Sequence, residues 1–355
     1  MKKIAFLLTI LMIAIIGVGV FLGFNYLKGP VDTSAKTVDF KVEKGDTFST
    51  IGDKLKQNGL IRDITFYKLY LKIKKPDTIK EGIHEVSAKM NLDELIKELS
   101  SKETKIESID ITFKEGRNMR YIVKTIKEVT GEKEEDIYAI LKDEKYLNEL
   151  IEKYWFITED IKNKDIYYSL EGYLYPDTYK IEKEKLNAKE IFNAMLDNME
   201  LKIKEYASDI KNSKYSFHEL LTLASMVESE VAGLENRKGV ASVFYNRLNA
   251  KMSLGSDVTT YYGIKIDMGE RDLYKSEVNA VNNYNTRSSS MAGKLPVGPV
   301  CNPSIESIEA VLFPEETNYY YFVTDKNKKV YFSKTSNEHN NTINKLKKEG
   351  LWYVH

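Results

Sequence analysis

One helical stretch decides how this 355-residue sequence is interpreted: Ser216-Phe217-His218-Glu219-Leu220-Leu221-Thr222-Leu223-Ala224-Ser225-Met226-Val227-Glu228-Ser229-Glu230-Val231. Ser216 and Glu219 fit a capping box, the serine–glutamate pair that closes the first turn of a helix. At about 100° per residue, one apolar stripe collects Leu220, Leu223, Ala224, Val227 and Val231. Glu228 falls between Leu221 and Ala224 in angle, so we expect its carboxyl group on the buried side of the helix.

A carboxyl group on an apolar face has two common environments, and the pattern leaves both open for Glu228. It can pair with a buried Arg or Lys. Alternatively it can open into a cleft, where loss of water raises its pKa and suits it to general acid catalysis. Glu230, at the edge of the same stripe, is the nearest alternative. Arg247, on a predicted helix at 238–248, is placed to reach a carboxylate.

The sequence on either side of this helix predicts an α+β domain at 104–355. Alternating or helical periodicity predicts these elements: a strand at 106–113, a helical region at 117–154, a loop and strand at 170–179, a helix at 187–206 with Asn187 as N-cap, a hairpin of 319–323 and 330–332, and a final helix at 337–348.

The N-terminus predicts a transmembrane anchor. Residues 4–27 are uncharged and form about 36 Å of helix, enough to cross a hydrocarbon core of about 30 Å. Lys2 and Lys3 precede them, which places residues 1–3 in the cytoplasm by the positive-inside rule. A cleaved signal peptide is the alternative, but the run is too long and ends without a small-x-small cleavage site. We therefore expect a single-pass plasma-membrane protein with an extracytoplasmic ectodomain and a linker at 28–37.

The composition excludes several classes of protein. Lys+Arg and Asp+Glu both number 53, and this net charge of zero argues against a nucleic-acid binder. A single cysteine, Cys301, excludes an internal disulfide. The four histidines are scattered, and His218-Glu219 lacks the second histidine of a zinc-protease motif. No metal or cofactor is expected.

Residues 38–103 predict a small mixed module. Phe40-Lys41-Val42 alternates like a strand, Glu43-Lys44-Gly45-Asp46 predicts a turn, and helical runs follow at 49–60, 64–73 and 92–99, with a strand at 83–86. The segment 40–48, followed by Ile51, resembles the start of a LysM domain, a small peptidoglycan-binding fold. A spacer between the membrane and the second domain is the alternative.

Several long segments, in order, resemble the YceG-like endolytic murein transglycosylases. The matching segments are 170–179 (LEGYLYPDTY), 223–228 (LASMVE), 240–248 (VASVFYNRL), 254–257 (LGSD), 284–286 (YNT) and 295–303 (LPVGPVCNP). Four positions depart from the family pattern: Val258 and Val297 replace prolines, Arg287 replaces an aromatic residue, and Ser304 replaces a glycine. None of these changes Glu228.

The resemblance implies an activity and a catalytic residue. The catalytic glutamate of the family aligns with Glu228. Such an enzyme cuts the β-1,4 bond between N-acetylmuramic acid (MurNAc) and N-acetylglucosamine (GlcNAc) in nascent glycan strands and leaves a 1,6-anhydro-MurNAc end. It ends strand elongation, so cell-wall synthases (penicillin-binding proteins) are the expected partners, beside peptidoglycan itself.

One carboxyl group suffices for this chemistry, because the C6 hydroxyl of MurNAc replaces water as the nucleophile. Polar residues that could contact the sugar are Glu171, Ser256, Asp257, Tyr284, Asn285 and Asn302; turn formation is the alternative role for the pairs Ser256-Asp257, Asn285-Thr286 and Asn302-Pro303. Two other functions remain open: a hydrolytic muramidase with Asp257 or Glu171 as second carboxylate, and a non-catalytic, membrane-tethered scaffold that binds peptidoglycan.

Overall fold

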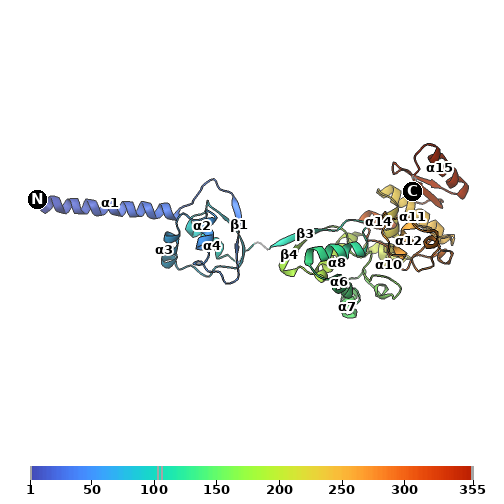
Figure 1. The fold of residues 1–355 in the computed structure, drawn as a ribbon, viewed down its shortest axis with the longest axis horizontal. Coiled ribbons are helices and arrows are strands. Elements are labelled where there is room, and N and C mark those ends of the chain that lie inside the picture. The colour runs from blue at the N-terminus through green and yellow to red at the C-terminus, as the bar shows by residue number, and fades with distance from the viewer. Residues whose placement is uncertain (1, 102–103, 105–106, 353–355) are drawn as a thin grey trace. The chain divides into compact units, whose positions relative to one another are not determined.

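The chain divides into two compact units, residues 1–108 and 109–355 (Figure 1). The computed structural model describes residues 2–101, 104 and 107–352. The predicted domain boundary at 103/104 therefore adjoins positions outside the described residues. The first unit contains α1 (Lys2–Lys28), β1 (Thr37–Val42), α2 (Gly52–Gln57), α3 (Ile64–Lys74), β2 (Gly82–Ser87) and α4 (Leu92–Leu99).

Helix α1 is 27 residues long and apolar over almost its whole length. Among the described residues it is the one helix whose length and composition allow it to cross a membrane. Its large side chains from Ile4 to Leu22 are about half to two-thirds exposed. Such a surface is stable only when another apolar phase, such as lipid, covers it.

The module that follows α1 has the elements that the sequence predicts. Strands β1 and β2 are antiparallel, with Phe40 opposite His84 and Val42 opposite Gly82. The Gly45-Asp46 turn closes with a bond from the Asp46 N–H to the Glu43 carbonyl. Alternate residues of β1 and the inner faces of the three helices form a separate core, which includes Phe40, Val42, Leu55, Tyr67 and Leu95.

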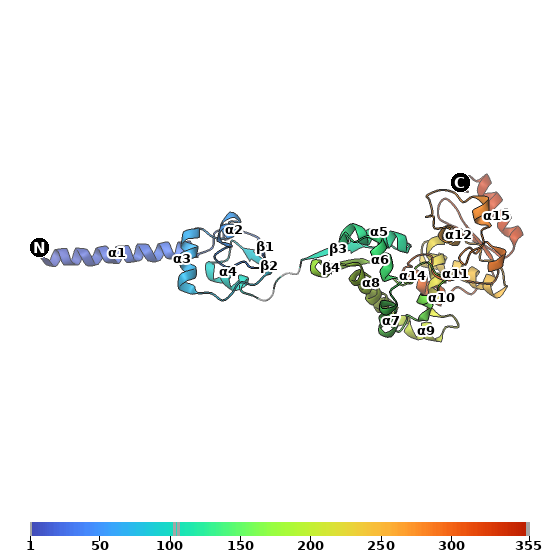
Figure 2. The ribbon, with the colours of Figure 1, turned by 60° about the horizontal axis from the view of Figure 1, so that its bottom comes forward.

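The second unit combines many helices with two pairs of strands (Figure 2). Its strands are β3 (Ser108–Thr112), which pairs with β4 (Thr178–Glu182), and β5 (Tyr321–Thr324), which pairs with β6 (Val330–Ser333). Its helices are α5 (Met119–Thr130), α6 (Glu134–Ile140), α7 (Glu144–Lys153), α8 (Ala188–Ile203), α9 (Ala207–Asn212), α10 (Phe217–Glu230), α11 (Leu234–Asn249), α12 (Asp257–Gly263), α13 (Lys275–Val278), α14 (Ile305–Leu312) and α15 (Ser336–Lys348).

The helical region predicted at 117–154 is three helices rather than one. Gly131 ends α5 with a left-handed backbone (φ 76°), and its N–H bonds to the carbonyl of Lys127. Asp143 then caps α7 by accepting bonds from the N–H groups of Lys145 and Tyr146. A residue with positive φ and a new N-cap both break helical continuity, so the apolar positions pack from three directions.

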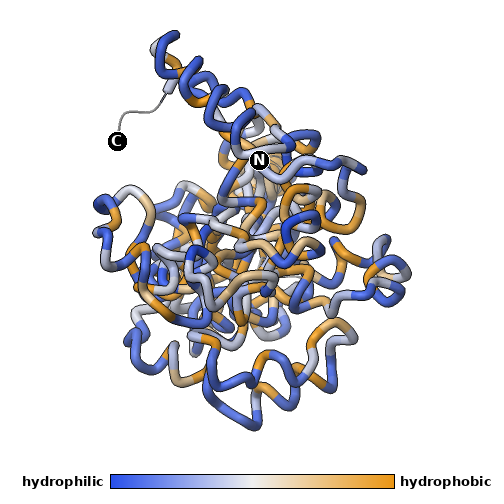
Figure 3. Tube along the Cα trace, turned by 90° about the vertical axis from the view of Figure 1, so that its right-hand side faces the viewer, coloured by the Kyte–Doolittle hydropathy of each residue, from blue (hydrophilic) through white to orange (hydrophobic). Residues whose placement is uncertain are grey.

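Helix α10 lies at the centre of the second unit and forms as predicted. Ser216 and Glu219 make the capping box, and every residue from Leu220 to Val227 is buried. Helices α11 and α14 both pack against α10. In Figure 3, hydrophobic segments concentrate toward the centre and hydrophilic loops lie at the rim. The last turn of α10, which carries Glu228, is thus held between two other helices.

Candidate active site

Glu228 lies in the last turn of α10 with only 6% of its side chain exposed. Its Oε1 accepts a 2.9 Å hydrogen bond from Nη2 of Arg237. Its Oε2 accepts bonds from the N–H of Ser304 at 3.0 Å, from the Ser304 hydroxyl, and from the Ser307 hydroxyl at 2.7 Å. Four hydrogen-bond donors thus converge on one carboxyl group.

The cation beside Glu228 is Arg237, in the first turn of α11. Gly233, with φ at +83°, turns the chain sharply between α10 and α11, so the two side chains meet although only nine residues separate them. The second terminal nitrogen of the guanidinium group, Nη1, donates a hydrogen bond to Oε2 of Glu306 at the start of α14. Arg237 is 8% exposed and Glu306 is 52% exposed, so this ion pair connects buried Glu228 to the surface.

The loop between β3 and α5 covers Glu228. A Cβ atom added to Gly116 would lie 3.6 Å from Cγ of Glu228, and the Gly116 N–H bonds to the carbonyl of Asn302. Burial and the negative charge of Glu228 raise the pKa of Glu115 in the same loop. Two further acidic side chains, those of Glu115 and Glu306, thus lie close to Glu228 and Arg237.

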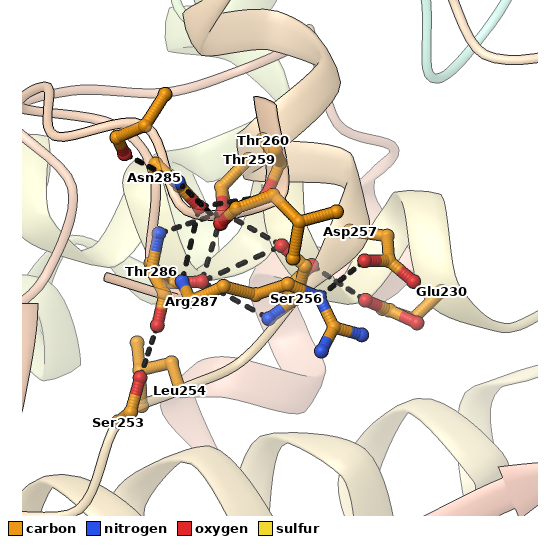
Figure 4. Close-up of polar contacts among 12 residues, drawn as sticks. Glu230, Ser253, Leu254, Ser256, Asp257, Thr259, Thr260, Asn285, Thr286 and Arg287 are labelled. Carbon is orange, nitrogen blue, oxygen red and sulfur yellow. Dashed lines mark hydrogen bonds and ion pairs between the residues drawn. The ribbon is translucent and has the colours of Figure 1, made fainter. Parts of the chain in front are cut away.

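Glu230 belongs to a second polar cluster, which includes Ser256 and Asp257 (Figure 4). Its Oε1 accepts a 2.5 Å bond from the Ser256 hydroxyl, and burial raises the pKa of its carboxyl group. Asp257, next in the chain, pairs with Arg287. Both partners of that pair are exposed, 52% and 39%, so the bridge closes the outer edge of the cluster.

The segment 285–287 is tied to α12 by side-chain hydrogen bonds (Figure 4). The side-chain oxygen of Asn285 accepts a hydrogen bond from the Thr260 hydroxyl. The side-chain NH₂ group of Asn285 donates to the backbone carbonyls of Val278 and Ala280. The Thr286 hydroxyl lies 2.8 Å from that of Thr259. These bonds use the polar atoms of Asn285 within the protein and fix the loop that carries Arg287.

Glu171 is 2% exposed and holds three separate parts of the chain together. It accepts hydrogen bonds from the Met119 N–H, the Tyr262 hydroxyl and the Asn302 NH₂ group. Burial raises the pKa of Glu171 to about 7 despite these donors. The side-chain oxygen of Asn302 also accepts a hydrogen bond from the Leu174 N–H. The bonds of Asn302 to Glu171 and Leu174 therefore hold the loop that leads to Ser304.

The sequence of most of both units matches a known family. A family model described as the YceG-like family covers residues 40–345. The chain belongs to the YceG-like family.

Two curated relatives carry a functional name. An endolytic murein transglycosylase of Bacillus subtilis is 35% identical over 324 residues, which is 91% of this chain and 88% of that protein. An endolytic murein transglycosylase of Streptococcus pneumoniae is 30% identical over 361 residues; the match covers 96% of this chain but 64% of the longer relative. A crystal structure of a YceG-like protein from Listeria monocytogenes superimposes with a TM-score of 0.61 at 30% identity, covering 87% of this chain and 100% of that one.

In this YceG-like chain, most of the predicted sugar contacts are buried. Five of the six are between 0% and 3% exposed, and each hydrogen-bonds to other protein groups: Glu171, Ser256, Tyr284, Asn285 and Asn302. Tyr284 also packs against the rings of Tyr167 and Tyr262. Of the predicted set, Asp257 has the exposed side chain. The structure joins Glu171 to Asn302 and places Ser256 beside Glu230, while Glu228 has its own set of partners.

Three partners of Glu228 were missed by sequence reasoning. The signal for Arg237 was present, since it precedes Val240 by three residues and Phe244 by seven, on the buried stripe of α11. Ser304 and Ser307 lie more than 70 residues from Glu228 and carry no local signal. Arg247 hydrogen-bonds to the carbonyls of Leu254 and Tyr320, so the ion pair of Glu228 falls to Arg237 instead. Among the described residues, no group of His, Cys, Asp and Glu gathers in a way that could hold a metal ion.

Proposed function

We propose that this chain is an endolytic murein transglycosylase and that Glu228 is its catalytic residue. Family membership and the names of the Bacillus and Streptococcus relatives support the activity. The observation that carries the assignment of Glu228 is its position: a carboxyl group at the end of the central helix, 6% exposed, in a nest of polar donors.

The proposed reaction uses this carboxyl group twice. Protonated Glu228 donates its proton to the glycosidic oxygen as the bond between C1 of MurNAc and GlcNAc breaks. The resulting carboxylate then takes the proton of the C6 hydroxyl, whose oxygen bonds to C1. The product is a 1,6-anhydro-MurNAc end, no water is consumed, and Glu228 returns to its protonated state.

The surroundings of Glu228 fit the second half of this cycle directly. Four donors stabilise a carboxylate, which is the form that accepts the C6 proton. For the first half, Glu228 must bind a proton while Arg237 stays charged. Glu306 makes this possible, because it gives Arg237 a second anion and so avoids a buried, unpaired cation.

The direct test is Glu228→Gln, which keeps the shape of the side chain and removes its titratable proton. We expect near-complete loss of glycan cleavage with folding intact, measured on purified strands. Glu230→Gln is the matched control on the same helix and should retain most activity. An active Glu228→Gln enzyme together with an inactive Glu230→Gln enzyme would move the catalytic role to Glu230.

The mass of the products separates the enzymatic alternatives. A transglycosylase leaves anhydro ends, which are one water lighter than the reducing ends left by a muramidase that uses Asp257 or Glu171 as second carboxylate. A peptidoglycan-binding scaffold would bind the strands and leave their length unchanged. The names of the relatives favour the transglycosylase.

Three further proposals concern the cellular setting. Residues 38–103 form a LysM-like module, supported by the strand, Gly45-Asp46 turn and helices that follow in the expected order. Residues 4–27 anchor the protein in the plasma membrane with residues 1–3 in the cytoplasm, supported by the apolar α1 and the lysines before it. Outside the membrane the enzyme works beside cell-wall synthases. Protease added to intact spheroplasts should digest the second unit if this orientation is correct.

A further inference from the structure

The end of α1 contacts the module that follows it. The ring of Phe24 lies 5.3 Å from that of Phe66 and 6.1 Å from that of Tyr70, both on α3. Arg62, just before α3, stacks over the ring of Tyr26 and donates to the carbonyl of Pro30. The C-terminal end of α1 is therefore held against α3 by side-chain contacts.

The outer edge of the bilayer falls at this contact between α1 and α3. About 20 helical residues cross a hydrocarbon core, so an α1 that enters the membrane at Ile4 leaves it near residue 24. A tyrosine at such a position, here Tyr26, is typical of the membrane–water interface. Because α3 contacts Phe24 directly, α3 lies at the same depth.

Helix α3 presents an amphipathic face away from the module. Tyr67 and Tyr70 point into the core, whereas Leu69 and Ile73, one turn apart, are 54% and 66% exposed. Lysines flank them on the exposed side: Lys68, Lys72, Lys74 and Lys75. In both Figure 1 and Figure 2, α3 runs across the axis of α1, as a helix in the plane of a membrane must when α1 crosses it.

The charges next to this face are arranged to leave it basic. Asp93 of α4 is the acidic group against the end of α3, and it is neutralised by Lys28 at 2.6 Å and Lys74 at 2.8 Å. The exposed side chains of Lys68 and Lys72 remain beside Leu69 and Ile73. Apolar side chains flanked by lysines fit the interface of a bilayer that contains anionic lipids.

We propose that α3 is a membrane-docking helix: Leu69 and Ile73 enter the outer leaflet at headgroup depth, and Lys68 and Lys72 contact anionic lipid headgroups. The module is then held against the membrane surface rather than suspended from a single anchor. The inference rests on the proposed anchor, since only an α1 that spans the bilayer brings α3 to its surface.

The test uses full-length protein in vesicles of phosphatidylcholine with phosphatidylglycerol. Single cysteines at Leu69 or Ile73 carry an environment-sensitive fluorophore; the natural Cys301 is buried and does not compete for the label. We expect quenching by nitroxide-bearing lipids and protection from aqueous iodide at both positions. A label at Asp53, exposed on α2, is the control and should show the reverse. Labels at 69 and 73 that behave like the one at 53 would overturn the proposal.

Two further variants sharpen this experiment. A label at Phe21, within α1, reports on the anchor. Lipid quenching at position 21 without quenching at position 69 would overturn the docking of α3 alone. No quenching at either position would overturn the proposed anchor itself. With a label at exposed Thr65, the double change Leu69→Glu and Ile73→Glu should reduce lipid quenching several-fold, and unchanged quenching would overturn the role of the two apolar side chains. Both altered side chains are exposed, so the fold is retained. Quenching at 69 that is equally strong without phosphatidylglycerol would overturn the role of Lys68 and Lys72.

Discussion

Nη2 of Arg237 lies 2.9 Å from Oε1 of Glu228, and both side chains are almost completely buried. A buried ion pair of this kind contributes little net stability, because removing two charges from water is costly. Arg237 also forms an ion pair with Glu306. Because of this second partner, the guanidinium group still contacts an anion when Glu228 carries a proton. Through Arg237, buried Glu228 is thus connected to a carboxylate at the surface.

Replacing Arg237 by methionine should therefore lower the stability of the protein. A buried carboxylate without its cation costs about 3–5 kcal/mol, so the free energy of unfolding at pH 7 should fall by that order. Urea unfolding of the variant and the native protein at pH 7 measures this effect.

The neighbouring Lys238→Met is a matched control for that variant. Lys238 pairs with Glu309 at 3.2 Å, and both side chains are about a quarter exposed. Partly exposed pairs are worth about 0–1 kcal/mol. Equal losses of stability in the two variants would contradict the account of Arg237.

Ser304→Gly should weaken the nest around Glu228 and leave the enzyme folded. The hydroxyl bond to Oε2 is lost, while the N–H bond of residue 304 is kept. A hydrogen bond to a charged group contributes about 1.5–3 kcal/mol, and removing it should lower stability by up to that amount. Ser307→Ala removes a comparable bond and should act in the same direction; opposite signs would contradict this reading of the nest.

The inward position of Glu228 could be predicted from the sequence, because the signals for α10 are local. A capping box fixes the first residue of the helix, and the 3.6-residue period then fixes which side each residue faces. Whether a helical region is one helix or several was harder to predict. Apolar residues recur at helical spacing throughout 117–154, and the chain is divided into three helices only by the left-handed backbone at Gly131 and the N-cap at Asp143.

The partners of Glu228 were less predictable, since they depend on tertiary contacts. Ser304, the N-cap of α14, and Ser307 in its first turn lie more than 70 residues further along the chain. Polar residues such as Asn285 and Asn302 were selected as sugar contacts because their types suit that task. The same side chains suit a buried loop equally well, as their hydrogen bonds to Thr260 and Glu171 show. Composition alone does not separate these two uses.

Glu171 should make the stability of the protein depend on pH between about 4.5 and 7. Burial raises the pKa of its carboxyl group from 4.5 to about 7, so the folded state binds the proton more tightly than the unfolded state. Its contribution to stability is present in full below pH 4.5 and is lost as the pH rises to 7, a change of about 2–3 kcal/mol at 1.36 kcal/mol per unit.

Glu171→Gln is the variant that isolates this effect. Glutamine stays neutral and resembles the protonated acid, so the stability of the variant relative to the native protein should increase from pH 4.5 to pH 7. Urea unfolding of both proteins at the two pH values measures it. A difference that stays constant with pH would show that Glu171 does not titrate in this range.

The loop that carries Glu171 should tolerate no side chain at Gly172. This glycine has φ at +86°, and an added Cβ atom would lie 2.5 Å from Cβ and Cγ of Pro299, far inside contact distance. Gly172→Ala must therefore strain the backbone and also push the 295–303 segment, which leads to Ser304, away from α10.

Gly131→Ala is a matched control, because Gly131 has φ at +76° with open space where the Cβ would go. The control should lose about 1–2 kcal/mol from the left-handed backbone alone. Gly172→Ala should lose more by at least 1–3 kcal/mol, the typical cost of overpacking, and should lose cleavage activity as Ser304 leaves Glu228. Equal stability of the two alanine variants would mean that Pro299 yields easily and that this loop does not hold the site in place.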